Sequence, residues 1–377
     1  MTLLDITLIL LGAGNSTRFK LPVKKQWLYS GDIPLWLQVA QNFDNFGVFS
    51  NIIIVSSPND IKHMQNFTDK YSFVTGGTTR QDSLNNALAN VTTKYVMVSD
   101  IARCCVPDDM IQRLLDAKEQ GSCIVPTLKV TDTLYLDGSP IDREATRIIQ
   151  TPQLSVTSLL KKALQSDIVF TDDSSAIASL GEKVLFVEGD IKAHKLTTVE
   201  DLSKLPCLNT PKDINLVGFG IDTHPFEDDK TMFLCGVEIE SNFGFKAHSD
   251  GDVAIHALID ALLGACGMGD IGELYPDDDN TYLGIDSKIL LRDTVDKIRA
   301  FGFDITNVDM TIVAQTPKLK KYKPLMRTTV ANLLGIKPQF VNIKATTSEK
   351  LGFIGRKEGV SVHAVANVTY FKWKEEK

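Results

Sequence analysis

Short apolar runs alternate with amphipathic segments through the first half of the chain. The runs are rich in β-branched side chains and do not alternate with polar residues, as is typical of parallel strands buried on both faces. They lie at residues 7–11, 52–55, 95–98, 123–125 and 184–187. Between them, the spacing of apolar residues predicts helices at residues 35–46, 81–91, 107–119 and 156–165. Strands that alternate with helices indicate an α/β fold with helices on both faces of the sheet.

This alternation breaks at residues 205–213, LPCLNTPKD, where two prolines flank a short polar segment of the kind that links domains. Beyond it, strands and helices are expected in a less regular order. The strands lie at residues 216–221, 305–314, 341–345 and 360–371, and the helices at residues 252–265, 287–301 and 322–334. We therefore expect an α/β domain over residues 1–206, a linker over 207–213 and an α+β domain over 214–377.

The composition is that of a folded protein with a mild excess of acidic residues. Hydrophobic residues make up 43% of the 377 residues, which is enough to build real cores and excludes disorder of the whole chain. The net charge of −7 argues against a nucleic-acid partner, because dedicated nucleic-acid-binding proteins are usually basic. No run reaches about 18 consecutive apolar residues, so we expect no membrane span.

The cysteines and the N-terminus indicate a compartment. None of the six cysteines forms a CxxC pair, and Cys104 and Cys105 are adjacent, which is poor geometry for a bond between them. This pattern predicts reduced thiols rather than a disulfide framework. The first apolar run has no basic residue before it and is interrupted by Asp5, so we expect no secretory signal and a cytoplasmic protein.

A loop of small residues follows the first strand. The segment GAGNSTR at residues 12–18 is followed by KKQ at 24–26. Small residues let backbone N–H groups approach phosphate oxygens, and Arg18 and Lys25 could neutralise charge on a transferring phosphoryl group. The loop is neither GxxxxGK[ST] nor GxGxxG, which disfavours a P-loop NTPase and a dinucleotide-binding fingerprint. A tight turn with solvated cations remains the alternative.

Two further segments extend this candidate phosphate site. GGTTRQDS at residues 76–83 is a second glycine turn that opens a helix, and SDIAR at 99–103 ends a strand. Asp100 lies at the carboxyl end of that strand, where parallel sheets collect their ligands, and a carboxylate there suits Mg²⁺. The alternative is that Asp100 caps the segment that follows.

The second half carries a candidate metal site. Asp222 and His224 follow a strand and alternate, so both side chains point to one face, and His256 lies on the long helix downstream. One aspartate and two histidines make a three-ligand set for Zn²⁺ with an open fourth position. The alternative is two unrelated histidines and a surface aspartate.

Four polar segments accompany these residues. They are AHSDGD at 247–252, GDIGELYPD at 269–277, AQTPK at 314–318 and KATTSEKLGF at 344–353. Hydroxyls and backbone N–H groups at strand ends suit a phosphate, and Glu349 suits a second cation.

The ordered motifs of the first half resemble those of the 2-C-methyl-D-erythritol 4-phosphate cytidylyltransferases of non-mevalonate isoprenoid synthesis. The resemblance covers about residues 5–205 and runs through GAGxxxRF, KKQW, GGTTRQDS, SDIAR, DT, TPQ, TDDSSA and VEGDIKAHKLTTVEDL. It implies a Rossmann-like nucleotidyltransferase domain that dimerises. The chain departs from the usual pattern at Gly12, at Ser16 and at Ala193, where alanine, glycine and asparagine are common.

This resemblance also implies residue roles. Arg18 and Lys25 would stabilise the transition state at the α-phosphorus of CTP, Arg143 and Lys195 would position the methylerythritol phosphate, and Asp100 would bind Mg²⁺. Arg80 and Ser83 would lie near the cytidine, and Thr171 would reach the substrate across a dimer interface. The implied substrate-binding residues are Gly12, Gly14, Arg80, Ser83, Thr133 and Thr171.

The motifs of the second half resemble those of the 2-C-methyl-D-erythritol 2,4-cyclodiphosphate synthases, over about residues 215–372. The resemblance implies that Asp222, His224 and His256 hold Zn²⁺ or another divalent cation. His248 and Thr346 would stabilise the transition state, and Glu349 would hold a Mg²⁺ that bridges two phosphates of the substrate. This family forms trimers with active sites between subunits.

The implied substrate-binding residues of this half are numerous. Those for the methylerythritol part and its neighbourhood are Asp222, Thr223, His224, Ser249, Asp270, Ile271, Gly272, Tyr275, Pro276, Asp277, Asp278 and Asp279. Those for the cytidine diphosphate part are Ala314, Gln315, Thr316, Pro317, Lys318, Leu319, Lys320, Thr347, Ser348, Glu349, Phe353 and Arg356.

Both resemblances together imply a bifunctional enzyme. One half would transfer CMP from CTP to methylerythritol 4-phosphate, and the other would convert 4-diphosphocytidyl-methylerythritol 2-phosphate to the cyclodiphosphate and CMP. A trimer-forming half joined to a dimer-forming half could build a hexamer. One alternative is a sugar-nucleotide pyrophosphorylase fused to a zinc hydrolase, which the set Lys25, Arg143 and Lys195 and the lack of HExxH disfavour. Another is a binding scaffold with one decayed half.

Overall fold

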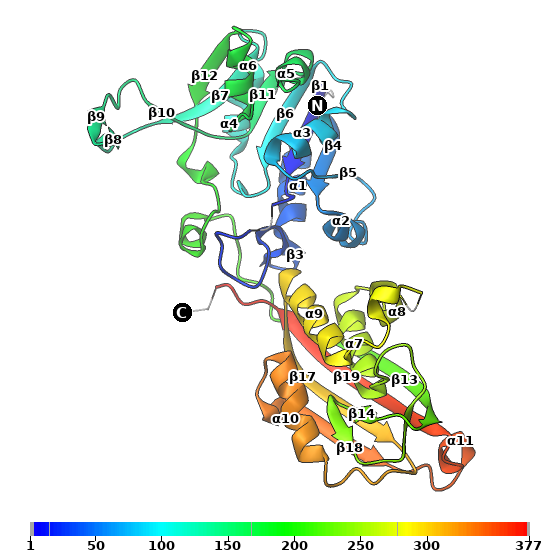
Figure 1. Cartoon of the computed structure of the whole chain (residues 1–377). Helices are drawn as coiled ribbons and strands as arrows, with labels where there is room; N and C mark the ends of the chain where they lie inside the picture. The colour runs from blue at the N-terminus through cyan, green and yellow to red at the C-terminus, as the bar shows by residue number, and fades with distance from the viewer. Residues whose placement is uncertain (1–3, 15, 167, 277, 375–377) are drawn as a thin grey trace. The chain divides into compact units, whose positions relative to one another are not determined.

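The computed structural model describes residues 4–14, 16–166, 168–276 and 278–374 (Figure 1). The chain divides into two compact units, of which the first ends at Thr210 and the second begins at Pro211. In the described part of the chain, no helix is long and apolar enough to cross a membrane.

The first unit is built on an eight-stranded sheet with the order β10-β7-β11-β6-β1-β4-β5, and β12 pairs with β7. The strands are β1 (Leu4–Leu11), β4 (Phe49–Ser56), β5 (Ser72–Thr75), β6 (Tyr95–Asp100), β7 (Cys123–Lys129), β10 (Arg147–Ile149), β11 (Gln153–Val156) and β12 (Val184–Glu188). β11 runs antiparallel to β6 and β7, and β10 runs antiparallel to β7, whereas the other pairings are parallel. The predicted α/β fold with a mostly parallel sheet is confirmed.

Helices surround this sheet, and strand β1 is buried on both faces, from Ile6 to Leu10. The helices are α1 (Leu35–Asn45), α2 (Pro58–Met64), α3 (Arg80–Leu88), α4 (Asp108–Asp116), α5 (Thr157–Ala163) and α6 (Asp173–Ser179), with 3₁₀ turns η1 (Lys25–Trp27), η2 (Ile191–Ala193) and η3 (Val199–Lys204). Two residues of a capping box begin α3, since the Thr79 hydroxyl accepts from the Asp82 N–H and the Asp82 carboxylate accepts from the Thr79 N–H. β2 (Tyr29–Ser30) and β3 (Ile33–Pro34) form a small separate ribbon.

A hairpin arm of the first unit was not predicted from the sequence. It consists of β8 (Leu134–Leu136) and β9 (Ser139–Ile141), and it extends away from the sheet (Figure 1). Asp137 and Gly138 connect the strands with φ values of 49° and 82°, the left-handed conformation that tight hairpin turns need. The Asp-Gly pair was therefore the sequence signal for this arm.

The second unit has a five-stranded sheet with the order β16-β13-β19-β17-β18. Its strands are β13 (Leu216–Asp228), β16 (Phe243–Phe245), β17 (Phe303–Val313), β18 (Val341–Thr346) and β19 (Gly359–Tyr370), and β14 (Met232–Leu234) pairs with β15 (Val237–Ile239). Its helices are α7 (Val253–Cys266), α8 (Ile271–Leu274), α9 (Ser287–Ala300), α10 (Lys323–Leu334) and α11 (Gly352–Gly355), with 3₁₀ turns η4 (Asn280–Tyr282) and η5 (Pro338–Phe340). The mixture of a mainly antiparallel sheet and helices confirms the predicted α+β class.

Helix α7 packs unusually close to β13 because that strand has glycines on its inner face. A Cβ at Gly218 would lie 1.9 Å from Ala261 O, and one at Gly220 would lie 2.1 Å from Ala257 O. Val217, Phe219 and Ile221, which alternate with these glycines, point to the opposite face and are exposed. One face of this part of the sheet is therefore covered by a helix and the other presents apolar side chains.

The prediction for β13 was too short. The strand continues through Asp222 and His224 to Asp228, and its pairing with β19 extends as far as Pro225. Aspartate and proline are poor strand formers, so the sequence pattern ended early, but pairing with a long neighbour overrides this local preference.

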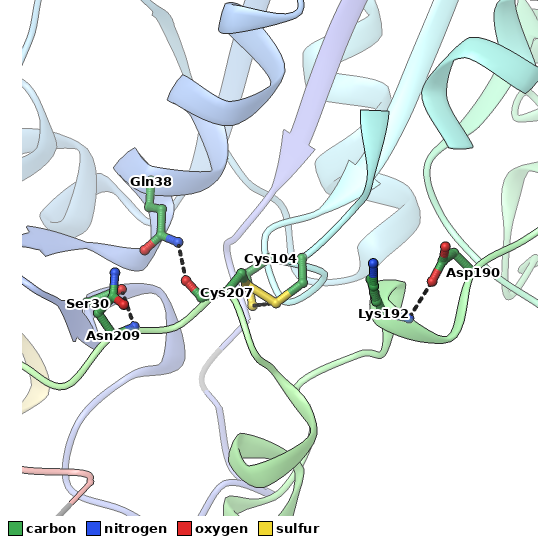
Figure 2. Close-up of a disulfide and its surroundings, with 8 residues drawn as sticks. Ser30, Gln38, Cys104, Asp190, Lys192, Cys207 and Asn209 are labelled. Carbon is green, nitrogen blue, oxygen red and sulfur yellow. Dashed lines mark hydrogen bonds between the residues drawn. A yellow bond between two sulfur atoms is a disulfide. The ribbon is translucent and has the colours of Figure 1, made fainter. Parts of the chain in front are cut away.

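The prediction of six reduced cysteines was wrong, because Cys105 and Cys207 form a disulfide (Figure 2). The other four cysteines are free in the described part of the chain. The two bonded residues are 102 positions apart, so sequence spacing could not reveal that the fold brings their Cα atoms to 5.5 Å. The beginning of the segment 207–213 is also fixed on the first unit, since Gln38 Nε2 donates to Cys207 O and Asn209 N donates to Ser30 Oγ.

An aromatic cluster of the first unit encloses a titratable group. The His63 ring lies 5.1 Å from the Trp27 ring and 5.6 Å from the Phe67 ring, measured between centroids. Burial lowers the pKa of His63 from 6.5 to about 4, against a smaller opposing effect of the Asp60 carboxylate. The folded unit therefore resists protonation of His63 at a pH where the unfolded chain accepts it.

We expect the free energy of unfolding of the first unit to fall as the pH is lowered from 6.5 to about 4, by about 3 kcal/mol from this group. The free energy of unfolding falls because the unfolded chain binds more protons than the folded chain in this range. Above pH 6.5 the contribution of His63 to stability is fully present. Urea unfolding followed by tryptophan fluorescence measures it, with His63→Phe as the control that should be less sensitive to pH. Parallel losses in both proteins would show that His63 is not the cause.

Candidate active sites

A first cavity of about 400 Å³ lies at the carboxyl ends of β1 and β6, beside the start of α3. Most of the residues predicted for the cytidylyltransferase site line it, namely Gly12, Gly14, Arg18, Lys25, Arg80, Ser83, Asp100 and Lys195. The sheet brings these together because the carboxyl ends of parallel strands meet at one edge. The Ser83 hydroxyl donates to Thr79 O and accepts from Gly77 N, so this side chain also shapes the glycine turn.

Asp100 lies at the centre of the charges in the first cavity. Lys195 Nζ lies 2.6 Å from Asp100 Oδ2, and Arg80 Nε lies 3.9 Å from Asp100 Oδ1. Burial raises the pKa of Asp100, but the cations of Lys195 and Arg80 outweigh burial and hold that pKa below its usual value. Arg80 is in turn held by the buried Asp173 at 3.0 Å, a partner that the sequence did not reveal.

Other cationic side chains surround Lys25. Its Nζ donates to Leu196 O at 3.1 Å, and burial, followed by the charges of Lys195 and Arg18, lowers its pKa. A site with this surplus of positive charge is suited to a polyanion, because an anionic ligand would relieve the mutual repulsion of the cations.

The three departures from the usual pattern fit the local structure. A Cβ at position 12 would lie 2.4 Å from Ile101 Cδ1, so glycine matches the isoleucine that faces it. Ser16 has a φ of 55°, which glycine would adopt more easily, but its hydroxyl accepts from Lys25 N at 3.1 Å and thereby connects the loop to η1. Ala193 is buried, and its carbonyl accepts from Arg103 Nη1 at 2.7 Å.

Three predicted residues lie outside the first cavity within one chain. Thr133, Arg143 and Thr171 are exposed and do not line it. Thr133 and Arg143 flank the hairpin arm, where Arg143 Nη1 donates to Thr131 O. The fold of a single chain therefore does not bring Arg143 to Lys25.

A second cavity of about 430 Å³ shares Lys195 with the first. Its lining includes Arg103, Gln150, His194 and Asp201, none of which the sequence singled out. Arg103 Nε is buried and has no hydrogen-bond partner among the described residues.

The second unit brings the predicted metal ligands together. Asp222 and His224 lie on β13, His256 lies on α7, and one ligand atom from each falls within 4.8 Å of the others. The two histidines present their Nδ1 atoms, at 3.2 Å and 3.3 Å from Asp222 Oδ2. Burial raises the pKa of Asp222, but the neighbouring His224 and His256 rings outweigh burial and lower that pKa, so the carboxylate is ionised.

Contacts on the side of the ring away from the metal cluster fix the orientation of His256. Its Nε2 lies 3.1 Å from the hydroxyls of Ser249 and of Ser287. Because the Ser287 hydroxyl donates to Asp250, its oxygen is left to accept from His256 Nε2–H, which leaves Nδ1 as the free acceptor. Asp250 and Ser287 were not predicted as site residues, although Asp250 lies in the polar segment at 247–252.

A third cavity of about 330 Å³ surrounds this cluster. The predicted residues that line it are Asp222, Thr223, His224, His248, Ser249, His256, Ile271, Gly272 and Tyr275. Asp260 also lines it, was not predicted, and accepts from Ile271 N at 2.8 Å. Asp270, Pro276, Asp278 and Asp279 do not line it, and Asp277 lies outside the described residues.

The predicted cytidine-diphosphate residues form a separate group at the ends of β17 and β18. Ala314 N donates to Thr346 O, and Lys350 N donates to Gln315 Oε1, so the two loops meet. Across the sheet, Thr223 pairs with Ser361, Ser361 with Val313, and Val313 with Thr346. Three strand spacings amount to about 14 Å, so one chain does not bring Thr346 to the metal cluster.

None of the residues of this group lines the third cavity. The group comprises Ala314, Gln315, Thr316, Pro317, Lys318, Leu319, Lys320, Thr346, Thr347, Ser348, Glu349, Phe353 and Arg356. Glu349 is exposed and accepts from the Thr347 hydroxyl at 2.8 Å. Arg356 is paired with Glu358.

The metal cluster offers the kinds of ligand atom that Zn²⁺ binds. The donor set is one carboxylate and two imidazoles, and His224 Nδ1 is buried without a hydrogen-bond partner among the described residues. A divalent cation would coordinate both this nitrogen and the ionised carboxylate beside it.

These features define a two-domain enzyme that handles phosphates, with a polycationic cavity on a parallel sheet in one unit and a carboxylate–imidazole cluster in the other. Comparisons with known proteins agree. Residues 6–206 match the family described as 2-C-methyl-D-erythritol 4-phosphate cytidylyltransferase, and residues 216–369 match the YgbB family.

Relatives match across both units at once. A bifunctional enzyme IspD/IspF of Sulfurovum sp. (strain NBC37-1) is 68% identical over 98% of this chain and 99% of the relative, and that of Campylobacter curvus is 51% identical over 98% and 100%. The solved structure of the bifunctional IspDF from Campylobacter jejuni is 48% identical, covers 98% of this chain and 100% of its own, and superposes with a TM-score of 0.92.

The chain belongs to the family of bifunctional IspD/IspF enzymes of isoprenoid biosynthesis. It combines a cytidylyltransferase domain with a cyclodiphosphate synthase domain, and its substrates are small molecules. The main expectation from the sequence is confirmed, and the comparisons support it over a pyrophosphorylase–hydrolase fusion and over a binding scaffold.

Proposed function

We propose that the first cavity binds CTP. Backbone N–H groups of the loop at residues 12–18 would contact the phosphates, and Arg18 and Lys25 would stabilise the charge that develops at the α-phosphorus. The observation that carries this assignment is the surplus of cations around Lys25, whose pKa is lowered by burial and by Lys195 and Arg18. Asp100 would bind the Mg²⁺ that accompanies CTP through a carboxylate oxygen. Lys195, which pairs with Asp100 in this structure, would then pair with a substrate phosphate instead.

The second cavity is our candidate for the methylerythritol phosphate. It shares Lys195 with the first cavity, and the unsatisfied Arg103 Nε offers a donor to an anion. A nucleophilic phosphate held between these cations would face the α-phosphorus of CTP, and alignment of this kind supplies much of the acceleration in such reactions.

Arg143, Thr133 and Thr171 would act from a second copy of the chain. Support comes from the arm itself, where Tyr135 is 67% exposed and Leu136 63% exposed. Apolar side chains at the tip of a projecting hairpin suit burial against another chain. We therefore propose a dimer through the first unit.

In the second unit, Asp222, His224 and His256 would hold Zn²⁺, which acts as a Lewis acid toward phosphate when bound. The 2-phosphate of the substrate attacks its own β-phosphorus and CMP leaves, so no nucleophile from the protein is needed. His248 lines the third cavity and would donate to a phosphate oxygen there. We assign Thr346 to the same role, and Glu349 would hold a Mg²⁺ that neutralises phosphate charge.

A trimer would unite the parts of this second site. Val217, Phe219 and Ile221 are 61%, 59% and 52% exposed on the uncovered face of the sheet, which favours burial against further copies. A neighbouring copy would then supply the loops at residues 314–320 and 346–349 to the metal cluster. Trimers through the second unit and dimers through the first would build a hexamer.

Phe219→Glu should therefore break the assembly of the second unit. Three charges forced together at an apolar contact are costly, so we expect smaller particles in light scattering and a loss of cyclase activity of roughly tenfold or more. Ile289→Glu is the matched control, since Ile289 is 53% exposed on α9, away from that face. A Phe219→Glu protein with unchanged mass and cyclase activity would contradict the trimer.

Each unit should carry its own activity, which tests the assignment of the two sites. The fragment of residues 1–210 keeps Cys207 and Asn209, which contact the first unit, and we expect it to transfer CMP without cyclase activity. The fragment of residues 1–206, which ends at the predicted domain boundary, should be less stable in thermal unfolding. If the fragment 1–210 folds, as judged by circular dichroism, but does not turn over CTP with methylerythritol phosphate, the first site is incomplete in this unit.

A further inference from the structure

Three cysteine sulfurs gather where the segment that leaves the first unit meets the loop after β6 (Figure 2). Cys105 and Cys207 are bonded, Cys104 Sγ lies 4.0 Å from Cys105 Sγ, and all three sulfurs lie within 4.8 Å of one another. Cys104 and Cys105 are buried, whereas Cys207 is partly exposed. Cys207 is therefore the half of the bond that lies nearer to solvent.

The bond ties the active-site loop to the exit segment. On the loop, Asp100 pairs with Lys195, and Ile101 and Ala102 line the first cavity. On the exit segment, Cys207 O accepts from Gln38 Nε2 at 3.2 Å, as Figure 2 shows. A change at this bond would act on the loop that carries Asp100 without touching the second unit's metal cluster.

Breaking the bond would not release either segment entirely. Ala102 O still accepts from Leu196 N at 2.8 Å, and Asn209 N still donates to Ser30 Oγ at 2.9 Å. The loop would keep its course but lose a cross-link between residues 102 positions apart, which constrains the unfolded chain strongly.

We propose that Cys105 and Cys207 form a reversible thiol–disulfide switch that holds the active-site loop in place when oxidised and loosens it when reduced by a dithiol. Disulfides in a reducing compartment, which the sequence predicts for this protein, are usually redox-sensing rather than structural. The switch acts on cytidylyl transfer and leaves the cyclase unchanged.

A dithiol reduces the bond by two successive thiol–disulfide exchanges. A thiolate of the dithiol attacks Cys207 Sγ, the S–S bond breaks, and Cys105 leaves as a thiolate that takes up a proton. The second thiol of the dithiol then attacks the mixed disulfide and releases Cys207. The protein gains two electrons and two protons, and the dithiol becomes a disulfide. A low-molecular-weight disulfide reverses the reaction.

Cys104 is a second candidate for a bond with Cys207. Burial raises the pKa of Cys104 to about 12, so its thiol stays protonated and exchanges slowly with the existing bond. Because its sulfur lies within 4.8 Å of that of Cys207, it should bond to Cys207 when Cys105 is absent.

Thiol titration of the denatured full chain tests the bond directly. After oxidation we expect four free thiols, those of Cys104, Cys123, Cys235 and Cys266, and after reduction all six. Cys207→Ala should give five under both conditions, whereas Cys104→Ala and Cys105→Ala should each give three after oxidation. This count is independent of the roles assigned to Lys25 and to the other residues of the site.

The functional test compares both activities in the oxidised and reduced forms. We expect reduction to lower cytidylyl transfer roughly threefold to tenfold, as a small displacement of a positioning loop does. The thermal midpoint of the first unit should fall by roughly 10 °C. Cys207→Ala should behave as the reduced form whatever the conditions, and Cys104→Ala should respond as the wild type does.

Three results would overturn the switch. Six free thiols after oxidation would show that the bond does not form. Equal cytidylyl transfer in the oxidised, reduced and Cys207→Ala proteins would leave a bond without regulatory effect. Zinc that stays bound to the reduced His256→Ala protein but is lost when Cys207 is also replaced would show a thiolate metal site in place of the switch.

Discussion

Replacing His256 by alanine should remove most of the bound zinc and abolish cyclodiphosphate formation, while cytidylyl transfer continues at the wild-type rate. His256 Nδ1 lies 3.3 Å from Asp222 Oδ2, and its Nε2 is held by Ser249 and Ser287 so that Nδ1 faces the cluster. Removing the imidazole leaves two protein ligands, which is too few for a stable catalytic site. Elemental analysis and both assays, run on the same preparations, measure the effect.

His363→Gln is the control for this experiment. His363 lies on β19, and its ring centroid is 5.9 Å from that of Phe219, outside the metal cluster. Its replacement should leave the zinc content unchanged. Equal zinc in the wild-type and His256→Ala proteins, or a His256→Ala protein that still closes the ring, would show that the cluster is not the catalytic metal site.

The Lys25→Ala enzyme should transfer CMP about 10²–10³ times more slowly than the wild type, with an unchanged cyclase. The reason is electrostatic, because Lys25 belongs to a preorganised set of cations with Lys195 and Arg18 around the first cavity. The loss should fall mainly on kcat, since the charge it meets develops in the transition state. Steady-state release of pyrophosphate measures it.

The neighbouring lysine provides a matched control. Lys24 Nζ pairs with Asp60 at 2.8 Å and does not line the first cavity. Lys24→Ala should therefore lower the stability of the first unit but leave kcat close to that of the wild type. If Lys25→Ala and Lys24→Ala proteins transfer CMP at similar rates, the role assigned to Lys25 is wrong.

The sequence predicted the elements whose pattern follows from burial. Strand β1 is buried from Ile6 to Leu10, and its uninterrupted apolar run was legible for that reason. Helix α7 was predicted to within one residue at each end, because its apolar positions repeat with the helical period and Asp252 caps its first turn. These elements need only local information.

Two features that the sequence missed depend on contacts between distant segments. β13 continues through Asp222 and His224 because β19 pairs with it, and Cys105 meets Cys207 only after the sheet has formed. The hairpin arm was missed although its Asp-Gly turn was a local signal.

The sites divide in the same way. The ligands Asp222, His224 and His256 were identifiable because strand alternation and a helix position point them to one place. Asp250 and Ser287, which hold His256 in place, could not be identified. Nothing in the sequence shows that a polar segment and the start of a distant helix meet behind His256. Residues such as Arg143 and Thr346 were identified only by resemblance, and one chain does not bring them to the cavities where they are expected to act.

If this single chain carries two independent active sites, it should carry out both reactions. Phosphorus NMR on the purified full chain tests it most directly, with CTP and methylerythritol 4-phosphate in one tube and 4-diphosphocytidyl-methylerythritol 2-phosphate in another, both with Mg²⁺ and Zn²⁺. We expect pyrophosphate and the cytidylylated product in the first tube, and the cyclodiphosphate with CMP in the second. A well-folded full chain that leaves either set of substrates unchanged would contradict it.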